Sequence, residues 1–467
     1  MVPGAMKART AAMIGMLATL APLGCSRPRR PSVVLVVVDT LRADRVGVYG
    51  NARGLTPFLD HLAHRGVLFR NAYAASSWTC PSVASLFTSR YPSQHHVTTY
   101  RSKLPDAERT LAEDLAAGGY VTMGLSGNLR LAEALGWGQG FATWRVYPEV
   151  TKLPANRLRR EGLHALDRAW PAGSPAPFFL YLQYMDPHPP YDPPSPYRER
   201  FGERVAEGTD PAEANRKVVD PFRWNELSAA DVRLLASLYD GEVAYLDHEL
   251  ARLFAALDRR GVLRDAIVVV TADHGEEFKE HELMGHGFGL YNQELRVPLI
   301  VAGRGVPAGR VVDDDVSLVD VAPTILALAG LPRNARFEGR SLVPLFSADG
   351  PTTDVIAELA PANPAFDARH QSAAIVRGTQ KLMVLAPNWA AVLGPVALYD
   401  LASDPGEVHA VLPLSLPDSP ARARGQALWD ALRREEDRLA RHNVTQPEER
   451  PLDAEQRERL RALGYVE

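Results

Sequence analysis

Continuous apolar runs and helix-like patterns alternate along most of the chain. The run Val33–Val38 is aliphatic throughout, which is typical of a strand buried on both faces of a parallel sheet. A helix is expected to begin at Pro57, with apolar residues at helical spacing through Leu62. The alternation continues with strands expected at 121–125, 177–184, 266–271 and 297–301 and helices expected at 110–117, 231–260 and 320–328. Strands that alternate with helices predict a doubly wound α/β fold with a mostly parallel sheet.

Shorter segments follow after about residue 350. Strands expected at 372–377, 380–385 and 396–399 favour a small antiparallel sheet. A charged helix is expected at 420–442, with Ser419 as its N-cap, and another at 453–463. We therefore expect a large α/β domain over 32–350 and a small C-terminal α+β subdomain over 351–467.

Residues 1–25 have the composition of an export signal. A basic start precedes an apolar run, Thr10–Leu23, that is shorter than the roughly 20 residues of a membrane-spanning helix. Gly24-Cys25 ends this run and resembles the cleavage site of a bacterial lipoprotein, in which the cysteine is lipidated. An ordinary secretory signal with an incidental cysteine is the alternative. We expect an exported protein of the periplasm or cell envelope, anchored to the membrane at Cys25, with 26–31 as a tether.

The composition narrows the classes of partner. A formal net charge of −4 over 467 residues gives no basic field of the kind that attracts nucleic acid. A hydrophobic content of 46% is enough for a large core. The two cysteines are Cys25 and Cys80, so a lipidated Cys25 leaves no disulfide framework, and stability has to come from that core.

Polar residues with metal-binding or catalytic potential follow three of the expected strands. Asp39 follows the first, Asp186 and His188 follow the strand at 177–184, and Asp273 and His274 follow the strand at 266–271. Doubly wound sheets bind their ligands beyond the carboxyl ends of the strands, so these side chains are expected to converge there. An Asp–His pair alone would be weak evidence, since buried acids after strands are often helix caps.

The order of the segments is more specific than any one of them. Beyond the strand ends, the informative segments are Thr56–Asp60, Ser77–Leu86, Tyr239–Glu242, Arg296–Pro298 and Leu398–Leu401. With this order the chain resembles the sulfatase family, within the alkaline-phosphatase superfamily, over nearly its whole length after Pro31. The resemblance implies an alkaline-phosphatase-like fold, a catalytic domain over 32–350, and the activity of a metal-dependent ester hydrolase.

The resemblance also implies a metal site. In the family the residue after the first strand binds the metal, which here is Asp39, and an Asp–His pair after a later strand supplies Asp273 and His274. The nucleophile completes the set, and Thr40 takes the place of a second aspartate found in many sulfatases. We expect one divalent ion. Zinc or manganese suits the imidazole best, and the oxygen ligands leave calcium and magnesium open.

The nucleophile signature of sulfatases, Cys-x-Pro-x-Arg, is altered in this chain. Alignment on Pro81 places Thr79 at the cysteine position, with Cys80 one residue late and Val83 in place of the arginine. The signal for oxidising a cysteine to formylglycine is therefore absent. Thr79 resembles the threonine nucleophiles of phosphodiesterases and of phosphoethanolamine or phosphoglycerol transferases. It is expected just before a helix, where free N–H groups favour an anion, and a threonine that only caps this helix is the alternative.

Two histidines are candidates for acid–base catalysis or for contact with the anion. His188 lies in a Pro-His-x-Pro element like the one that contacts the transferred group in the family. His286 lies near the position where many sulfatases carry a lysine, and a histidine there can protonate a leaving oxygen. Alternatively, Asp186, His188 and His286 bind a second metal ion. Weaker candidates for the site are Arg42, Arg90, His95, His96 and Asn128.

The threonine changes the expected chemistry. A formylglycine hydrate expels sulfate through its second hydroxyl, whereas an ester of Thr79 has to be cleaved by water or another acceptor. We therefore expect a small anionic ester substrate, with phosphoryl transfer through a covalent Thr79 intermediate favoured. A sulfuric ester hydrolase that uses Thr79 is one alternative. A binding lipoprotein with a decayed site is another, because Thr40 and Val83 replace residues of the family pattern.

Overall fold

The structure is a computed structural model that describes residues 29–150, 152–171, 173–201, 209–359, 372–385, 396–411, 419–442 and 446–449, together with Met1, Ala454 and Glu458. The expected signal peptide with Cys25 lies outside these residues, as does nearly all of the helix expected at 453–463. Within the described part of the chain, no helix combines the length and the apolar character needed to cross a bilayer.

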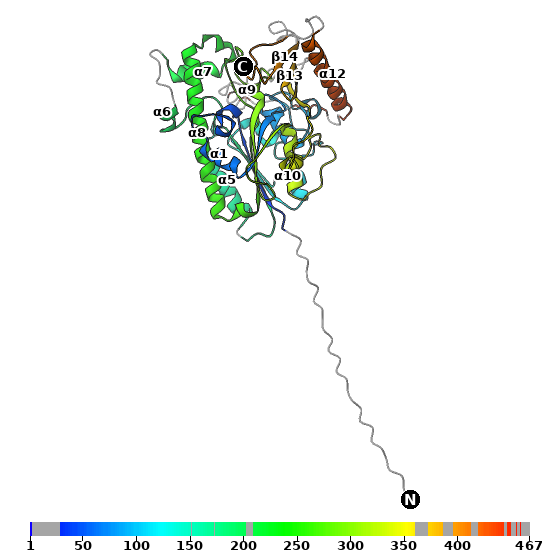
Figure 1. The fold of residues 1–467 in the computed structure, drawn as a ribbon. Coiled ribbons are helices and arrows are strands. Elements are labelled where there is room, and N and C mark those ends of the chain that lie inside the picture. The colour runs from blue at the N-terminus through cyan, green and yellow to red at the C-terminus, as the bar shows by residue number, and fades with distance from the viewer. Residues whose placement is uncertain are drawn as a thin grey trace.

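A large sheet forms the centre of the molecule (Figure 1). Its strands are β1 (Ser32–Val38), β2 (Gly66–Tyr73), β3 (Val121–Ser126), β4 (Thr143–Val146), β5 (Phe178–Tyr184), β6 (Ala266–Ala272), β9 (Arg296–Gly303) and β10 (Arg310–Ser317). They lie in the order β10-β2-β9-β6-β1-β5-β3-β4. Only β9 runs antiparallel to its neighbours, so the sheet is mostly parallel, as predicted.

The register of the central strands determines where the chemistry lies. Val38, the last residue of β1, pairs with Tyr184 of β5 on one side and with Ala272 of β6 on the other. All three strands are buried along nearly their whole length, which explains why their sequences are continuously apolar. Asp39 and Asp273 therefore leave the sheet at the same level and from adjacent strands.

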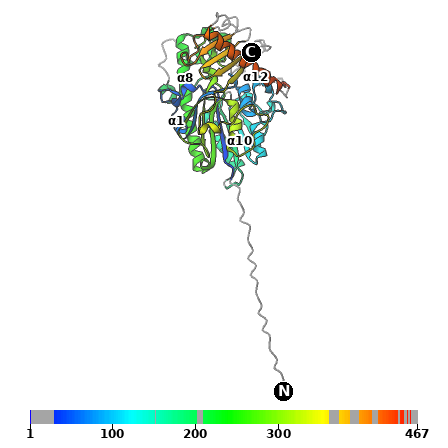
Figure 2. The same cartoon turned by 45° about the vertical axis from the view of Figure 1, so that its right-hand side comes forward.

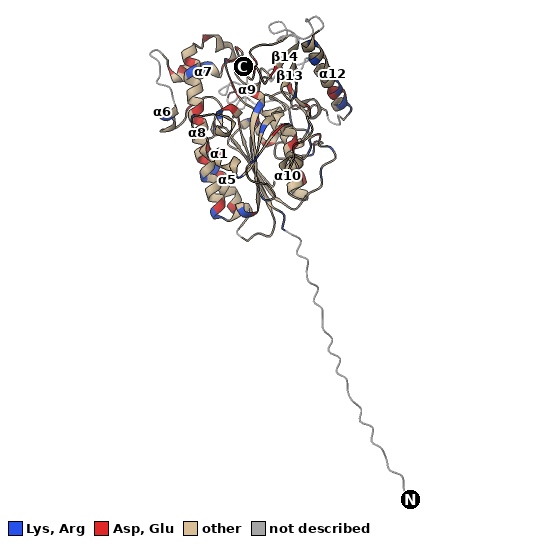
Figure 3. Cartoon of the chain, in the orientation of Figure 1, with Lys and Arg blue, Asp and Glu red and all other residues tan. Residues whose placement is uncertain are grey.

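Helices cover both faces of this sheet. On one side lie α1 (Pro57–His64), α5 (Ala155–Ala169) and the long α8 (Ala229–Arg259), and α8 contacts both of the other two (Figure 1). On the other side α10 (Val321–Leu328) packs with α2 (Thr79–Thr88) and α4 (Leu111–Ala117). Two further helices, α6 (Tyr197–Phe201) and α7 (Pro211–Val218), contact α8. Acidic and basic positions are interspersed along α5 and α8 (Figure 3).

A second, antiparallel sheet follows in the C-terminal part. Its strands β11 (Val355–Leu359), β12 (Ser372–Arg377), β13 (Gln380–Val384) and β14 (Val396–Asp400) lie in sequence order. Helix α12 (Pro420–Arg441) contacts β12 and β13, and Ser419 accepts a hydrogen bond from the N–H of Arg422 as its N-cap. Figures 1 and 2 show this subdomain at one end of the molecule, next to the short helix α9 (Asn292–Leu295).

A polar bridge joins the C-terminal sheet to helix α9. Lys381 of β13 is fully buried and pairs with Glu407, with 2.6 Å between Nζ and Oε1. Lys381 also donates to Oδ1 of Asn292, and the N–H of Asn292 donates to Oε2 of Glu407 at 2.5 Å. The C-terminal subdomain is therefore bonded to α9, immediately before β9 of the large sheet.

The predicted elements correspond closely to the observed ones. The expected strands of both sheets and the expected helices within the described residues are confirmed to within two residues at each end. The elements that the pattern does not predict include strands β2, β4, β10 and β11 and helices α5, α6, α7 and α9. The described end of the expected tether lies against the domain, because Arg30 donates to the carbonyl of Gly118 and Tyr120 donates to the carbonyl of Pro31.

Candidate metal centre and active site

Three ligand-type side chains meet at the carboxyl ends of β1 and β6. Asp39, Asp273 and His274 each offer one ligand atom, and these atoms lie within 4.8 Å of one another. Nε2 of His274 lies 3.5 Å from Oδ1 of Asp39 and 3.8 Å from Oδ2 of Asp273. All three side chains are fully buried.

The three residues fit a divalent cation. Oδ1 of Asp39 is buried and accepts no hydrogen bond from the described residues. Nδ1 of His274 donates to the carbonyl of Gly275 at 2.9 Å, which leaves the lone pair of Nε2 facing the carboxylates. Asn128 donates to Oδ2 of Asp39 at 2.7 Å, and Gln183 donates to Oδ2 of Asp273 at 2.9 Å. Oriented carboxylates and an imidazole are the donor set of a metal site.

The pKa values of these three residues also favour a bound cation. Burial raises the pKa of Asp39 to about 8, with a further rise from the neighbouring carboxylate of Asp273. Burial also raises the pKa of Asp273 to about 7 and lowers that of His274 to about 4. Two carboxyl groups held together out of water resist ionisation, and a bound cation would favour their charged forms.

The hydroxyl of Thr79 faces this ligand set. Its Oγ1 lies 3.4 Å from Oδ2 of Asp39 and 3.3 Å from Nε2 of His274. Asn128 donates to the same oxygen from 3.3 Å. Thr79 was expected just before the helix, but it is the first residue of α2, and Trp78 occupies the N-cap position without a side-chain cap. The hydroxyl therefore does not cap the helix.

Cys80 has a different environment. Its side chain is buried, and burial raises the pKa of the thiol to about 12. The thiol is therefore protonated near neutral pH and is a poor nucleophile. Of the two adjacent residues, only Thr79 has a hydrogen bond to a metal-ligand side chain among the described contacts.

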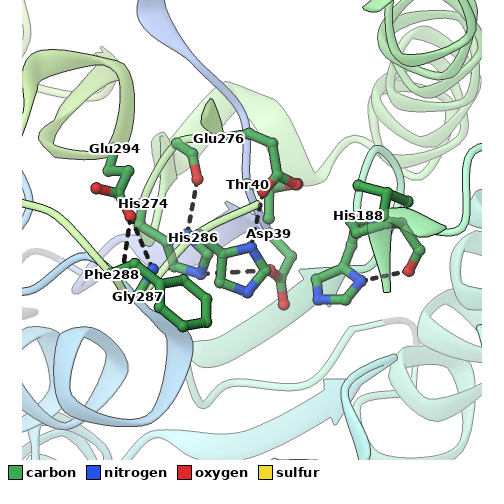
Figure 4. Close-up of polar contacts among 12 residues, drawn as sticks. Asp39, Thr40, His188, His274, Glu276, His286, Gly287, Phe288 and Glu294 are labelled. Carbon is green, nitrogen blue, oxygen red and sulfur yellow. Dashed lines mark hydrogen bonds and ion pairs between the residues drawn. The ribbon is translucent and has the colours of Figure 1, made fainter. Parts of the chain in front are cut away.

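His188 and His286 lie beside the candidate metal ligands. The ring centroid of His286 is 4.5 Å from that of His274 and 5.0 Å from that of His188, and Figure 4 shows the three rings in a row. Nδ1 of His188 lies 2.6 Å from the carbonyl of Pro189, and Nδ1 of His286 lies 2.9 Å from Oε1 of Glu276. Burial lowers the pKa of both histidines, that of His286 to about 3, and it raises the pKa of Glu276 to about 8.

The alternative of a second metal ion held by Asp186, His188 and His286 is not supported. Among the described residues, the side chains close enough to share a metal ion are those of Asp39, Asp273 and His274. Asp186, His188 and His286 do not form a second group of this kind. The carboxyl of Asp186 lies beside Glu242, and burial together with that neighbour raises its pKa well above the usual range. Lys152 donates to Glu242 at 2.8 Å, so this cluster is balanced by a cation of the chain itself.

Several side chains at the site were missed or ranked low from the sequence. Asn128, a weaker candidate, bonds to both Asp39 and Thr79. Arg130 follows it in the same 3-10 turn, is buried, and its charge contributes to lowering the pKa of His286. Both residues follow β3, so the strand-end rule that selected Asp39 would have found them.

The other weaker candidates have local structural partners. Arg42 forms ion pairs with Asp44 and Glu280, with 2.8 Å and 2.6 Å between the charged atoms. Arg90 pairs with Glu108 at 3.3 Å. The ring of His95 contacts the hydroxyl of Ser85 at 3.1 Å. The described contacts of these three residues are not with the metal ligands.

Two known proteins are similar to this chain in sequence. The chain is 28% identical to the multifunctional alkaline phosphatase superfamily protein PehA of Trinickia caryophylli, over 71% of this chain and 79% of that protein. It is 25% identical to an arylsulfatase of Clostridium perfringens, over 67% of this chain and 78% of that protein.

Two solved structures show the same fold. The phosphonate monoester hydrolase of Agrobacterium radiobacter superposes with a TM-score of 0.70 at 24% identity, covering 91% of this chain and 100% of that chain. A 2-O GAG sulfatase superposes with a TM-score of 0.70 at 20% identity, covering 90% and 95%.

Family models match both parts of the chain. The model described as N-sulphoglucosamine sulphohydrolase, C-terminal, matches residues 279–416. The model described as Sulfatase matches residues 31–331, which is more than half of the chain and includes every strand of the large sheet. The chain therefore belongs to the sulfatase family of the alkaline-phosphatase superfamily, and it is a sulfatase-like ester hydrolase.

Proposed function

We propose that this protein transfers phosphoryl groups from small anionic esters to water or another acceptor, through a covalent intermediate on Thr79. The observation that carries the proposal is the position of the Thr79 hydroxyl, 3.4 Å from a carboxylate oxygen of Asp39 and 3.3 Å from Nε2 of His274. A hydroxyl at the ligand set of a metal is the arrangement that nucleophilic catalysis by a weakly acidic alcohol requires.

Asp39, Asp273 and His274 would hold one divalent ion, with Thr79 as the fourth ligand. Such an ion lowers the pKa of a bound hydroxyl and neutralises charge on the transferred group. The donor set of two carboxylates and one imidazole favours zinc or manganese, while calcium and magnesium are compatible with the oxygen ligands.

Residues of the chain carry out the nucleophilic attack and the proton transfers. Oγ1 of Thr79 gives its proton to Oδ2 of Asp39, to which it already donates at 3.4 Å, and attacks phosphorus. The bond from phosphorus to the leaving oxygen breaks as the new ester forms. His286 gives a proton to that leaving oxygen, so the alcohol departs neutral. Water then attacks phosphorus and gives a proton to His286 as the bond from phosphorus to Oγ1 breaks. Thr79 takes its proton back from Asp39, and phosphate is released. An anionic group beside the His286 ring favours the protonated imidazole and offsets the effect of burial.

Four further groups favour an anionic substrate at this position. Asn128 already bonds to Thr79, and Arg130 brings a buried positive charge into the same turn. The first turn of α2, which begins at Thr79, directs backbone N–H groups and the positive end of the helix dipole toward the hydroxyl. His188 lies next to the His286 ring, on the side away from His274, and is a second contact for the transferred group.

Phosphoryl transfer is favoured over sulfate hydrolysis because of the nucleophile. A threonine ester has no second hydroxyl through which the product can be expelled, and a phosphothreonine can be cleaved by water with the help of a metal. A phosphonate monoester hydrolase is also among the structural relatives.

Two other functions follow from particular observations. A sulfuric ester hydrolase on the same site is supported by the arylsulfatase relative. A non-catalytic binding protein is supported by the losses at Thr40 and Val83, although the cluster of Asp39, Asp273 and His274 argues against decay.

A substrate panel tests the proposal. The purified protein, loaded with each metal in turn, is offered phosphomonoesters, phosphodiesters, phosphonate monoesters and sulfate esters. We expect turnover of phosphorus esters with at least one metal. Turnover of sulfate esters alone would favour the sulfatase alternative, and a protein that binds metal but is inactive on every ester would favour the binding protein.

We also propose that the protein is exported and anchored at the cell envelope through Cys25. The support is the apolar run that ends in Gly24-Cys25. The substrate would then be an ester that is available outside the cytoplasm.

A further inference from the structure

Glu276 is a buried carboxyl group with two partners and no established role. Its Oε1 lies 2.9 Å from Nδ1 of His286, and its Oε2 accepts a hydrogen bond of 3.0 Å from the hydroxyl of Tyr191. The side chain is fully buried. A carboxyl group that bonds to the inner nitrogen of a histidine fixes the ring and leaves its other nitrogen directed away.

A small hairpin brings Glu276 and His286 together. Strands β7 (Glu277–Phe278) and β8 (Met284–Gly285) pair with each other, and Glu277 lies opposite Gly285. Glu276 and His286 are the next residues outward from this pair, so they face each other at the open end of the hairpin. Their contact is therefore a product of the backbone and does not depend on a mobile side chain reaching across a gap.

Backbone hydrogen bonds to α9 fix the position of Glu276. Its N–H donates to the carbonyl of Gln293 at 2.9 Å, and the N–H of Gly275 donates to the carbonyl of Glu294 at 2.7 Å. A Cβ atom at Gly275 would lie 1.9 Å from the carbonyl oxygen of Gln293, which explains why the position is a glycine. Glu276 is thus attached both to the metal-ligand segment and to α9.

Packing and hydrogen bonds also hold Tyr191 in place. Its ring packs against Tyr239 and Phe278, with both pairs of centroids 5.8 Å apart. Asn215 of α7 accepts a hydrogen bond from the backbone N–H of Tyr191 at 2.6 Å and donates to its carbonyl at 2.9 Å. The hydroxyl therefore reaches Glu276 from a rigid support.

We infer that Glu276 is the positioning residue for His286, with Tyr191 holding the second carboxyl oxygen in place. This role deepens the proposed function and rests on it. In this role Nδ1 of His286 donates its proton to Oε1 of Glu276, 2.9 Å away. When the leaving oxygen takes the proton from Nε2, the shared proton rests on Nδ1, and the water that cleaves phosphothreonine later returns a proton to Nε2.

The test compares two leaving groups in one variant. Glu276→Gln keeps the size of the side chain but replaces the oxygen facing Nδ1 or the oxygen facing Tyr191 with an amide nitrogen. Alkyl esters need a proton on the departing oxygen, whereas 4-nitrophenyl esters leave as a stable anion. We expect kcat to fall about 100-fold or more on an alkyl phosphonate or phosphate ester, and less than about tenfold on the matching 4-nitrophenyl ester.

Glu277→Gln is the matched control. Glu277 is also a buried carboxylate that bonds to Nδ1 of a histidine, His281, at 2.8 Å, but that histidine contacts the carbonyl of Gly406 in the C-terminal part. Glu277→Gln should change kcat on the two esters by the same small factor. Tyr191→Phe keeps the Glu276 carboxyl and should show the selective loss of Glu276→Gln at a smaller size.

Equal losses on the two esters in Glu276→Gln would overturn the inference while leaving phosphoryl transfer established by the wild type. If Glu276→Gln is inactive on both, Tyr191→Phe decides, and an equal loss there overturns the role. A wild type that is inactive on every phosphorus ester overturns the proposed function and this role together.

Discussion

The hydroxyl of Thr79 lies 3.3 Å from Nε2 of His274, although 195 positions separate the two residues in the chain. The contact depends on how the first turn of α2 packs against the end of β6. Ser82, in that turn, donates a 2.6 Å hydrogen bond to the carbonyl of Asp273, the residue before His274. The helix that carries the proposed nucleophile is thus bonded directly to the segment that carries two of the proposed metal ligands.

Replacing Thr79 should separate chemistry from folding. Thr79→Ala should lower turnover by about 1,000-fold or more, because the covalent route is lost, and Thr79→Ser should retain partial activity because the hydroxyl survives. Steady-state kinetics with thermal melts of each variant measures both effects. Cys80→Ala is the control on the neighbouring residue and should change kcat little.

Mass spectrometry provides an independent check of the same residue. Protein from a host that makes formylglycine should carry unmodified Cys80, and protein quenched during turnover should carry a phosphoryl group on Thr79. An aldehyde at position 80 would contradict the threonine mechanism and restore a sulfatase that uses formylglycine.

Metal content should depend on the three ligands. We expect about one divalent ion per wild-type chain and strongly reduced content in Asp273→Ala, because one of two carboxylate ligands is lost. Elemental analysis after gel filtration measures this. Asp315→Ala is the control, since Asp315 is a buried aspartate bonded to the N–H of Gly378, away from the ligand set. Equal metal in wild type and Asp273→Ala would refute the assignment.

The metal-free protein should lose stability as the pH rises. Burial, with Asp273 as a neighbour, raises the pKa of Asp39 from 3.8 to about 8, and burial raises that of Asp273 from 3.8 to about 7. The folded state then binds these protons more tightly than the unfolded chain. The stability they contribute is complete below the unfolded pKa of 3.8 and is lost as the pH rises through about 7 and 8.

The comparison with Asp39→Asn isolates this effect. Between pH 5 and 8, the melting temperature of the stripped wild type should fall more steeply than that of the variant, and added metal should remove the difference in slope. Parallel slopes for the two stripped proteins would show that the two carboxyl groups are not coupled to folding in this way.

Fractionation of cells tests the anchor. Wild type should sediment with membranes, and Cys25→Ser should appear in the soluble exported fraction, because lipidation at Cys25 is lost. Cys80→Ser serves as the control for removing a thiol. A wild-type protein in the cytoplasm would be inconsistent with export.

The buried strands could be predicted because nearly every side chain in them is apolar. Strand β1 is buried along nearly its whole length, and this leaves a continuous pattern. Strand β2 escaped prediction because Arg70 and Asn71 interrupt it where the register shifts. Strand β10 lies at the edge of the sheet and carries Asp313, Asp314 and Asp315, so its composition is that of a loop.

Part of the candidate site could also be predicted from the sequence. Asp39, Asp273 and His274 follow strands, and the strand-end rule brings them together. The contact between Glu276 and His286 was not predictable, because it depends on a hairpin with two residues in each strand, which is too short to leave a periodic pattern. Single-sequence patterns record burial, and they do not record which buried polar groups face one another.

The buried bridge from Lys381 and Glu407 to Asn292 has a consequence for protein engineering. Asn292 begins α9, and Glu294 in the same helix accepts a 2.7 Å hydrogen bond from the N–H of Gly287, next to His286. A chain shortened after the large sheet would leave the amide of Asn292 without these partners and would loosen the segment that carries His286. Exchanging the C-terminal subdomain with that of a relative would therefore require the counterparts of Lys381 and Glu407 to be transferred with it.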